Sequence, residues 1–246
     1  RAKDELGLRI DVVPGREEAR LIYLGVAHAL DLRHEPALIV DIGGGSVELI
    51  LTENGEATSL HSLKLGVTRL AEQFLDADPP TPKALRALDA HVAAEIEPVV
   101  GLFRKRGVRR VIGTSGTMLN VIALAGHRRG TPPEGHLDGF EVGADEVAVL
   151  RRILQKSDRR ARGQMKGLDA KRIDTILPGI VVADAVLQTL RAVRLVGCTW
   201  SLREGVLLDF IARHPRKIAD ADHIASPRGR SVARLRRRFG DYAGHA

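Results

Sequence analysis

The sequence predicts an α/β protein in which short apolar strands alternate with amphipathic helices, and three segments support this prediction. The run LIVDIGGGSVELI, from Leu38 to Ile50, has two apolar stretches joined by three glycines, a pattern typical of strand, tight turn and strand. Apolar residues recur at helical spacing between residues 85 and 99. Residues 109–124 have the pattern of a buried strand, a loop of small residues and an apolar helix.

The composition is that of a globular protein large enough to bury a substantial core. The chain has 246 residues, of which 44% are hydrophobic and 28% charged. Cys198 is the sole cysteine, which excludes an intrachain disulfide and favours a reducing, cytoplasmic location. No apolar run approaches the roughly 20 residues that span a bilayer, so we expect no membrane partner.

The net charge of +7 indicates a negatively charged partner. Aromatic residues make up only 3% of the chain, which disfavours a stacking platform for nucleic acid. Phosphate-rich small molecules or polymers fit this balance better, and nucleic acid is an unlikely partner. The alternative is that the basic residues only solvate exposed helix faces.

The first elements are predicted from turn and helix-start signals. Leu6–Val13 is predicted to be a short strand, and Arg16–Leu30 a helix. Glu17 and Glu18 lie in the first turn of that helix, where the helix dipole favours acids. Asp31–Pro36 is polar and ends in proline, so it is predicted to be a connection.

The segment after the glycine run predicts a meander. The pair Asn54-Gly55 is a strong hairpin signal, and it predicts a third strand from about Ala57 to Leu63. We therefore expect three consecutive antiparallel strands between Leu38 and Leu63. A helix from Gly66 through Leu75 should follow.

The remaining chain is predicted to continue the alternation of helix and strand. Residues 78–82 form a proline-rich entry to the helix that contains residues 85–99, and Pro98 is a candidate kink. The later predicted segments are a small-residue loop at Gly113–Thr117, a polar loop at His127–Gly139, helices at Ala144–Gln155 and Asp169–Arg194, a strand at Leu195–Cys198 and a closing helix at Leu202–Ile211.

Two stretches concentrate the positive charge. Nine Lys or Arg lie between Arg151 and Arg172, which suits a long polyanion. From His214 onward eight Lys or Arg face three Asp, so this tail supplies +5 of the net charge. Its run Arg236-Arg237-Arg238 is weak evidence for nucleic-acid binding without aromatic residues beside it.

The glycine run is a candidate phosphate and metal site. Gly43, Gly44 and Gly45, followed by Ser46, let the backbone adopt positive φ and bring bare N–H groups close to an anion. Asp41 and Glu48 flank this loop and would share a cation beside the anion. A glycine turn in a plain hairpin is the alternative.

The small-residue loop after the second predicted strand–loop–helix unit is a further anion candidate. Ser115, Gly116 and Thr117 would present hydroxyls and helix N–H groups to a phosphate or nucleotide. A tight turn capped by Ser or Thr explains the same residues equally well. Arg203 and Glu204 near the end of the chain are predicted to form a structural ion pair.

Four segments resemble, in order, the exopolyphosphatase / guanosine pentaphosphate phosphohydrolase (Ppx/GppA) family of the actin-like phosphotransferase superfamily. The matching runs are GREEAR with Leu21 and Ile22, DIGGGS with Glu48, GTSGT at 113–117, and LREGVL at 202–207. Each run is moderately specific, and their order and spacing make the match strong. The resemblance extends from about Leu6 to the C-terminus.

The resemblance implies an actin-like (ribonuclease-H-like) α/β fold, a mixed sheet flanked by helices, as the second half of a two-domain core. Residues 1–32 would end the first subdomain, 33–213 form the second, and 214–246 form a basic linker and the start of a helical domain. The family's first phosphate loop, of the form Asp-x-Gly-Ser-Asn-Ser, has no counterpart, so we expect an internal fragment of a longer protein.

The resemblance also implies a reaction. Glu18 would act as general base on a water that cleaves the terminal phosphoanhydride of polyphosphate or of pppGpp, a nucleotide of the stringent response. Between these two substrates, the basic stretch from Arg151 to Arg172 mildly favours polyphosphate. Asp41 and Glu48 would hold Mg²⁺, Gly43–Ser46 and Ser115–Thr117 would contact phosphate, and the protein would be a homodimer. One alternative is a binding regulator of the same fold without catalysis. Another is a kinase-like member of the superfamily, which the GREEAR and LREGVL runs disfavour.

Overall fold

The computed structural model describes residues 5–7, 12–133 and 135–215. The chain divides into two compact units, Arg1–Gly205 and Val206–Ala246. The sheet, the core and the candidate site all belong to the first unit. In the part of the chain that the structure describes, no helix is long and apolar enough to cross a membrane.

A six-stranded mixed sheet forms the centre of the first unit, in the order β3-β2-β1-β4-β6-β5. The strands are β1 (Ala37–Ile42), β2 (Val47–Glu53), β3 (Glu56–Leu63), β4 (Arg110–Thr114), β5 (Glu141–Gly143) and β6 (Arg194–Gly197). The pairs β1–β2, β2–β3 and β5–β6 are antiparallel, whereas β4 pairs in parallel with β1 and β6. The predicted α/β class and the three consecutive antiparallel strands are confirmed.

The β2–β3 hairpin forms at the predicted Asn-Gly turn. Asn54 and Gly55 adopt φ values of 54° and 88°, the left-handed conformation that such turns require. Tyr23 donates its hydroxyl to the Gly55 carbonyl oxygen at 2.8 Å and so ties the turn to the first long helix. β1 is buried along its whole length, while β3 is half exposed, as expected for the edge of the sheet.

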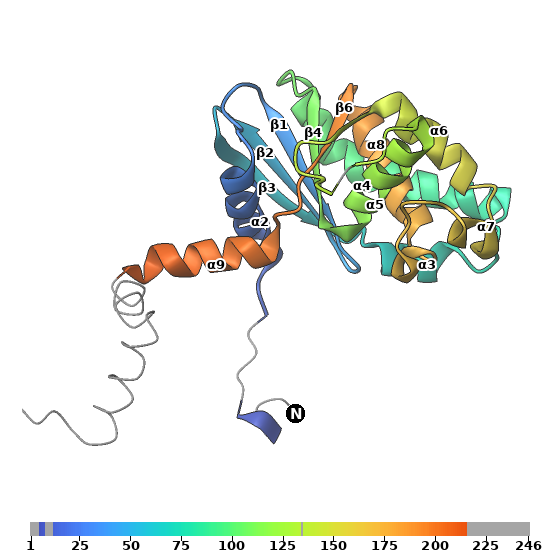
Figure 1. Cartoon of the computed structure of the whole chain (residues 1–246), viewed down its shortest axis with the longest axis horizontal. Coiled ribbons are helices and arrows are strands. Elements are labelled where there is room, and N and C mark those ends of the chain that lie inside the picture. Colours follow the sequence, from blue (N-terminus) through green and yellow to red (C-terminus); the bar gives the residue numbers. More distant parts are fainter. Residues whose placement is uncertain (1–4, 8–11, 134, 216–246) are drawn as a thin grey trace, which may run out of the picture. The chain divides into compact units, whose positions relative to one another are not determined.

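Helices cover both faces of the sheet (Figure 1). Helix α2 (Gly15–Ala29) packs through Ala19, Ile22 and Val26 on one face, against Ile39 of β1 and Ile50 of β2. The opposite face packs against a larger set of helices through the main hydrophobic core. This second layer contains α3 (Val67–Phe74), α4 (Pro82–Arg104), α5 (Ser115–Arg129), α6 (Ala144–Leu154) and α8 (Ile176–Leu190).

Most predicted elements lie within a few residues of their observed positions. α2, α3, α6 and β6 match the predicted segments closely, and α9 (Leu202–Arg213) matches the predicted closing helix. α4 continues past Pro98 to Arg104, so the proline does not end it. The basic tail, including Arg236–Arg238, lies outside the described residues.

Four local predictions are wrong or incomplete. Glu5 and Leu6 are helical and residues 12–14 have no regular structure, so the described ends of Leu6–Val13 are not strand; residues 8–11 are outside the described ranges. The predicted loop at Gly113–Thr117 does not exist, because β4 ends at Thr114 and α5 begins at Ser115. The predicted helix at Asp169–Arg194 is instead a 3₁₀ helix, η1 (Ala170–Arg172), then α8 and the start of β6.

The fourth prediction that differs from the structure is the polar loop at His127–Gly139. α5 runs on to Arg129 and ends at Gly130, whose φ of 82° is the left-handed conformation common at helix C-termini. The short strand β5 at Glu141–Gly143 follows and was not predicted. Its three residues are too few to show an alternating pattern.

The basic stretch from Arg151 to Arg172 serves the fold at several positions. Arg151 bridges Asp89 and Asp184 at 2.6 Å each, and Arg159 pairs with Asp174 at 2.8 Å. Arg162, in the short helix α7 (Arg159–Gly163), is 5% exposed and donates to the carbonyl oxygens of Ile173 and Ser157 and to Asp78. These arginines are therefore not free to bind a polyanion.

Replacing Arg162 with methionine should destabilise the fold. The change leaves two carbonyl oxygens and Asp78 Oδ1 without their donor, while Asp78 Oδ2 keeps the backbone N–H of Arg159. The expected cost is about 2–3 kcal/mol in the free energy of unfolding. The urea unfolding midpoint measures this loss. Arg160→Met, in the same helix at an exposed position, is the control and should change the midpoint little; equal effects of both changes would contradict the proposed anchoring role.

Candidate active site

Three carboxylates face one another at one end of the sheet. Side chains alternate along a strand, so Asp41 lies on the same face of β1 as Ile39, and Glu48 on the same face of β2 as Ile50. Both isoleucines pack with α2, and Asp41 and Glu48 are direct partners in the β1–β2 register. Burial is the main cause of the raised pKa of both carboxyl groups, and the charge of Glu18, in the first turn of α2, raises each pKa further. The structure thus brings these three predicted residues together, and their roles in a site remain a prediction.

Burial shapes the electrostatics of this group. Glu48 is 1% exposed, and this burial raises the pKa of its carboxyl group to about 7. Hydrogen bonds from Ser62 and Ser46 lower the pKa but do not cancel the effect of burial. The Ser62 hydroxyl donates to Glu48 Oε1 at 2.8 Å. Burial likewise raises the pKa of Asp41 to about 6. Two contacts act in the opposite direction and lower this pKa: the hydrogen bond that Ser201 Oγ donates to Asp41 Oδ2 at 2.6 Å, and the positive charge of Arg172.

Glu18 differs from its neighbour Glu17 in its contacts. Arg20 donates to both carboxylate oxygens of Glu17, at 2.8 and 2.7 Å, which agrees with a local helix role for Glu17. Within the described ranges, the carboxylate of Glu18 has no hydrogen-bond or ion-pair partner. A half-buried carboxylate without a partner is free to accept a proton or to orient a water molecule.

A pocket of about 390 Å³ lies in front of Glu18 and Asp41. Ser115 and Gly116, at the N-terminal end of α5, contribute a helix terminus whose unpaired N–H groups favour anions. Arg172 and Arg203 contribute two guanidinium groups to the same lining. The pocket therefore combines carboxylates with positive groups, the combination that phosphoryl transfer requires.

The junction between β4 and α5 explains how Ser115 reaches this pocket. Ser115 adopts φ of 69°, a left-handed conformation that turns the chain from strand into helix without a loop. Its hydroxyl donates to the Ile42 carbonyl oxygen at 3.0 Å, which ties the helix start to the end of β1. Thr114 donates its hydroxyl to the Trp200 carbonyl oxygen at 2.9 Å and holds the chain just before Ser201.

Arg172 is held against the start of α5. Its Nη1 donates to Thr117 Oγ1 at 3.0 Å, and its guanidinium lies so close to Gly116 that a Cβ at that position would overlap it. Thr117 itself is buried and does not line the pocket. Its hydroxyl oxygen therefore acts as a hydrogen-bond acceptor for Arg172 in this structure. The small residues predicted to contact an anion thus also make room for a cation.

The glycine loop adjoins Asp41 but does not line this pocket. None of Gly43, Gly44 and Gly45 has positive φ, so the expectation of left-handed turns is wrong. Glycine is needed for close approach instead, because a Cβ on Gly66 would overlap the backbone of Gly44 and Gly45. The start of α3 donates N–H groups to the Gly43 and Gly44 carbonyl oxygens.

The loop leaves backbone donors open. Gly43 N–H donates to the Ser46 carbonyl oxygen at 3.0 Å and closes the turn. The N–H groups of Gly44 and Gly45 donate to no other backbone group in the described part of the chain, and both residues are exposed. An anion can therefore approach these two N–H groups from solvent.

The donor set suits a magnesium ion only in part. Among the described residues, no three His, Cys, Asp or Glu side chains are arranged to hold a metal. Mg²⁺, however, is commonly held by one or two carboxylates together with water and substrate phosphates. Asp41 and Glu48, buried with raised pKa values next to Glu18, supply such a pair, and a divalent cation would offset their mutual repulsion.

Replacing Glu48 with glutamine should stabilise the metal-free protein at high pH. The folded-state pKa of Glu48 is raised from 4.5 to about 7, so its contribution to stability is fully present below pH 4.5 and is lost as the pH rises through 7. In EDTA at pH 8 we expect Glu48→Gln to gain up to about 3 kcal/mol in unfolding free energy, and almost nothing at pH 4. Urea titrations at both pH values measure this, and Glu53→Gln is a control at a more exposed position on the same strand.

Sequence analysis missed the pocket residues that come from distant segments. Arg172 was counted only within a basic stretch, and Ser201 was not singled out. The predicted ion pair between Arg203 and Glu204 is wrong, because Glu204 accepts the Ser201 backbone N–H at 3.0 Å and Arg203 lines the pocket. The LREGVL run was the available signal for this segment.

Known proteins match the chain over most of its length. The model of the Ppx/GppA phosphatase family matches residues 1–214. The chain is 34% identical over 223 residues to a guanosine-5'-triphosphate,3'-diphosphate pyrophosphatase of Photobacterium profundum, covering 87% of this chain and 41% of that protein. It is 31% identical over 186 residues to exopolyphosphatase 2 of Mycobacterium tuberculosis, covering 75% of this chain and 57% of that protein.

Solved structures agree with the fold. An exopolyphosphatase from Cytophaga hutchinsonii superimposes with a TM-score of 0.76 at 26% identity, covering 85% of this chain and 68% of that chain. The Aquifex aeolicus Ppx/GppA protein gives a TM-score of 0.70 at 24% identity, which supports the fold alone. The chain spans about two fifths to three fifths of the length of the two curated relatives described above. From the family match and the shared fold, the chain belongs to the Ppx/GppA phosphatase family.

Proposed function

We propose that this chain provides the water-activating half of a site that hydrolyses terminal phosphoanhydrides. The observation that carries the proposal is one pocket lined by Glu18, Asp41, Arg172 and the N-terminal end of α5. Carboxylates alone would repel a phosphate, and cations alone would only bind it. Both kinds of group around one cavity suit phosphoryl transfer to water.

Glu18 is the general base in this proposal. Its carboxylate lines the pocket and has no partner of its own within the described ranges, so it can accept a proton from the attacking water. The water oxygen forms a bond to the terminal phosphorus as the bond to the bridging oxygen breaks. The products are orthophosphate and a chain or nucleotide shorter by one phosphate.

Positive groups bind the phosphate. The open N–H groups of Gly44 and Gly45 hold terminal phosphate oxygens, with Ser46 beside them. The N-terminal turn of α5, through Ser115 and Gly116, and the guanidinium of Arg172 offset the charge that develops on the transferred phosphoryl group. We assign Thr117 the indirect role of positioning Arg172.

Asp41 and Glu48 would hold Mg²⁺ in the loaded enzyme. The ion supplies charge neutralisation for the phosphate oxygens. The protein's own contribution is to keep both carboxylates on one face of the β1–β2 pair, fixed by hydrogen bonds from Ser201 and Ser62.

Relatives bear both substrate names, pppGpp pyrophosphatase and exopolyphosphatase, and we propose that one or both of these phosphoanhydrides is the substrate. Arg151, Arg159 and Arg162 are already paired with carboxylates. The preference for polyphosphate drawn from residues 151–172 therefore depends on the other six basic residues of that stretch, and it remains a prediction. The homodimer, the cytoplasmic location, a place in the stringent response and the subdomain limits at residues 32 and 213 remain predictions.

Phosphate release by the full-length protein tests the proposal. Long-chain polyphosphate and pppGpp are supplied separately, with Mg²⁺ or with EDTA, and we expect orthophosphate only with the metal. Binding without release would favour the regulatory alternative. Transfer of phosphate from ATP to an acceptor other than water would favour the kinase-like one.

A further inference from the structure

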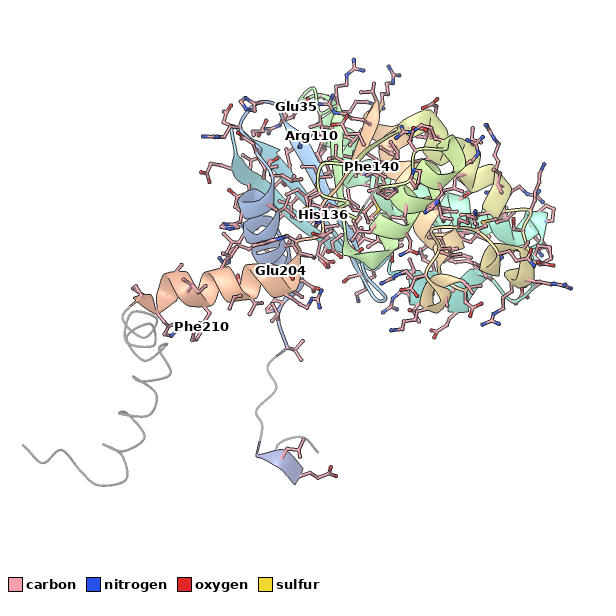
Figure 2. The ribbon with its side chains drawn as sticks, in the orientation of Figure 1. Glu35, Arg110, His136, Phe140, Glu204 and Phe210 are labelled. Carbon is pink, nitrogen blue, oxygen red and sulfur yellow. The ribbon has the colours of Figure 1, made fainter. Side chains whose placement is uncertain are left out.

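A basic run joins the end of α4 to the start of β4. Five of the seven residues from 104 to 110 are Lys or Arg. Two of them have partners. Arg106 pairs with Glu53 at 2.9 Å, and Arg110 lies 4.0 Å from Glu35 (both labelled in Figure 2). The side chains of the other three, Arg104, Lys105 and Arg109, have no hydrogen-bond or ion-pair partner within the described ranges.

These three side chains share a pocket with a fourth cation. The pocket has a volume of about 320 Å³, and Arg191 joins the three in lining it, over the apolar side chains of Val108 and Leu190. Arg191 also has no partner in the part of the chain that is described. Among the residues that the structure describes, no carboxylate lines this pocket. Four positive charges therefore lie together there without a counterion from the described chain.

The helix ends nearby do not balance this charge. α4 ends at Arg104 and α8 ends at Leu190, so two helix C-termini adjoin the pocket. Each C-terminus is equivalent to roughly half a negative charge, so the two together offset about one of the four positive charges. The remaining positive charge favours the approach of an anion from solution.

The backbone at Arg191 is a second, independent observation. Arg191 caps α8 with φ of 55° and ψ of 39°, the left-handed conformation that glycine adopts most easily at helix C-termini. An arginine at this position costs conformational energy that a glycine would not. Strain of this kind accompanies functional positions, and here the strained residue contributes its side chain to the pocket lining.

We propose that this pocket, lined by Arg104, Lys105, Arg109 and Arg191, binds a compact inorganic oligophosphate. Guanidinium and ammonium groups are the usual donors to phosphate oxygens, and three or four of them match the charge of tripolyphosphate. None of the described residues that line the pocket has an aromatic ring to stack on a base, which favours an inorganic chain over a nucleotide or nucleic acid.

The pocket is separate from the candidate active site. Arg109 precedes β4, and Ser115 of the active-site pocket follows it. Six residues of extended chain at about 3.3 Å each put the two ends about 20 Å apart. Binding here does not depend on hydrolysis, so the proposal stands or fails independently of the proposed function.

Calorimetric titration of the 246-residue chain with tripolyphosphate in EDTA tests the proposal. The Arg109→Gln/Arg191→Gln pair should weaken binding about tenfold or more, the loss expected when charged donors to phosphate are removed. The control pair Arg152→Gln/Arg160→Gln removes the same charge at exposed positions outside the pocket and should weaken binding less than about threefold. Thermal melts of each variant verify folding, and Arg104→Gln/Lys105→Gln serves as a second pocket variant.

Two results would overturn the proposal. The first is equal weakening by the pocket and control pairs, which would mean that net charge alone attracts the ligand. The second is tighter binding of GTP or of a DNA duplex than of tripolyphosphate, which would assign the pocket to another class of ligand. Loss of binding in both pocket variants, with the control unchanged, supports the assignment.

Discussion

Replacing Glu18 with glutamine should lower the turnover number for phosphate release by about 10²- to 10⁴-fold, the range typical of a lost general base. Glutamine keeps the size of the side chain but cannot accept the proton from water. The KM should stay the same or fall, because the change removes a negative charge next to the bound phosphates. Orthophosphate release at saturating polyphosphate or pppGpp measures both parameters in the full-length protein.

Glu17→Gln is the matched control for this change. It removes the same charge from the same helix turn, so both variants alter the helix dipole alike. Glu17 forms an ion pair with Arg20. A pair of this kind, partly open to solvent, contributes at most about 1 kcal/mol to stability. Its turnover should therefore stay within a few-fold of wild type. A Glu18→Gln enzyme as active as Glu17→Gln would remove Glu18 from the mechanism.

Local signals predicted the meander at the centre of the fold. The Asn-Gly pair and the two apolar runs around the glycines specify β1, β2 and β3 through contacts between residues close in sequence. The same kind of signal fails for β5, which is three residues long and exists because it pairs with β6. Pro98 does not end α4, since buried residues on both sides of the proline pack into the core and keep the helix intact.

The part of the candidate site that lies within one short sequence motif could be predicted. Asp41, the glycine loop and Glu48 lie within eight residues, and their register follows from the turn between them. Arg172 was not predictable, because its place depends on η1 meeting the start of α5 across a tertiary contact with Thr117. The unpaired cations around Arg109 were overlooked for a related reason: sequence shows charge, but not which charges are already paired.

Replacing Arg172 with glutamine should lower turnover by about a thousandfold, near the low end of the effect of arginines that stabilise a transferring phosphoryl group. The guanidinium lines the pocket with Glu18 and Asp41 and is its positive group nearest to the start of α5. Lys171→Gln is the control, because it removes a charge from the same 3₁₀ helix at an exposed position. A loss of the same size in both variants would contradict a direct role for Arg172.

The contact between Thr117 and Arg172 allows a sharper test of positioning. Thr117→Val keeps the shape of the buried side chain but removes the oxygen that accepts from Arg172 Nη1. We expect about tenfold lower turnover with little change in KM, because substrate still binds while the guanidinium is less well oriented. If Thr117 acts only through Arg172, adding Thr117→Val to Arg172→Gln should cause no further loss. Additive losses would instead mean that Thr117 contributes by a separate route, such as a direct contact with phosphate.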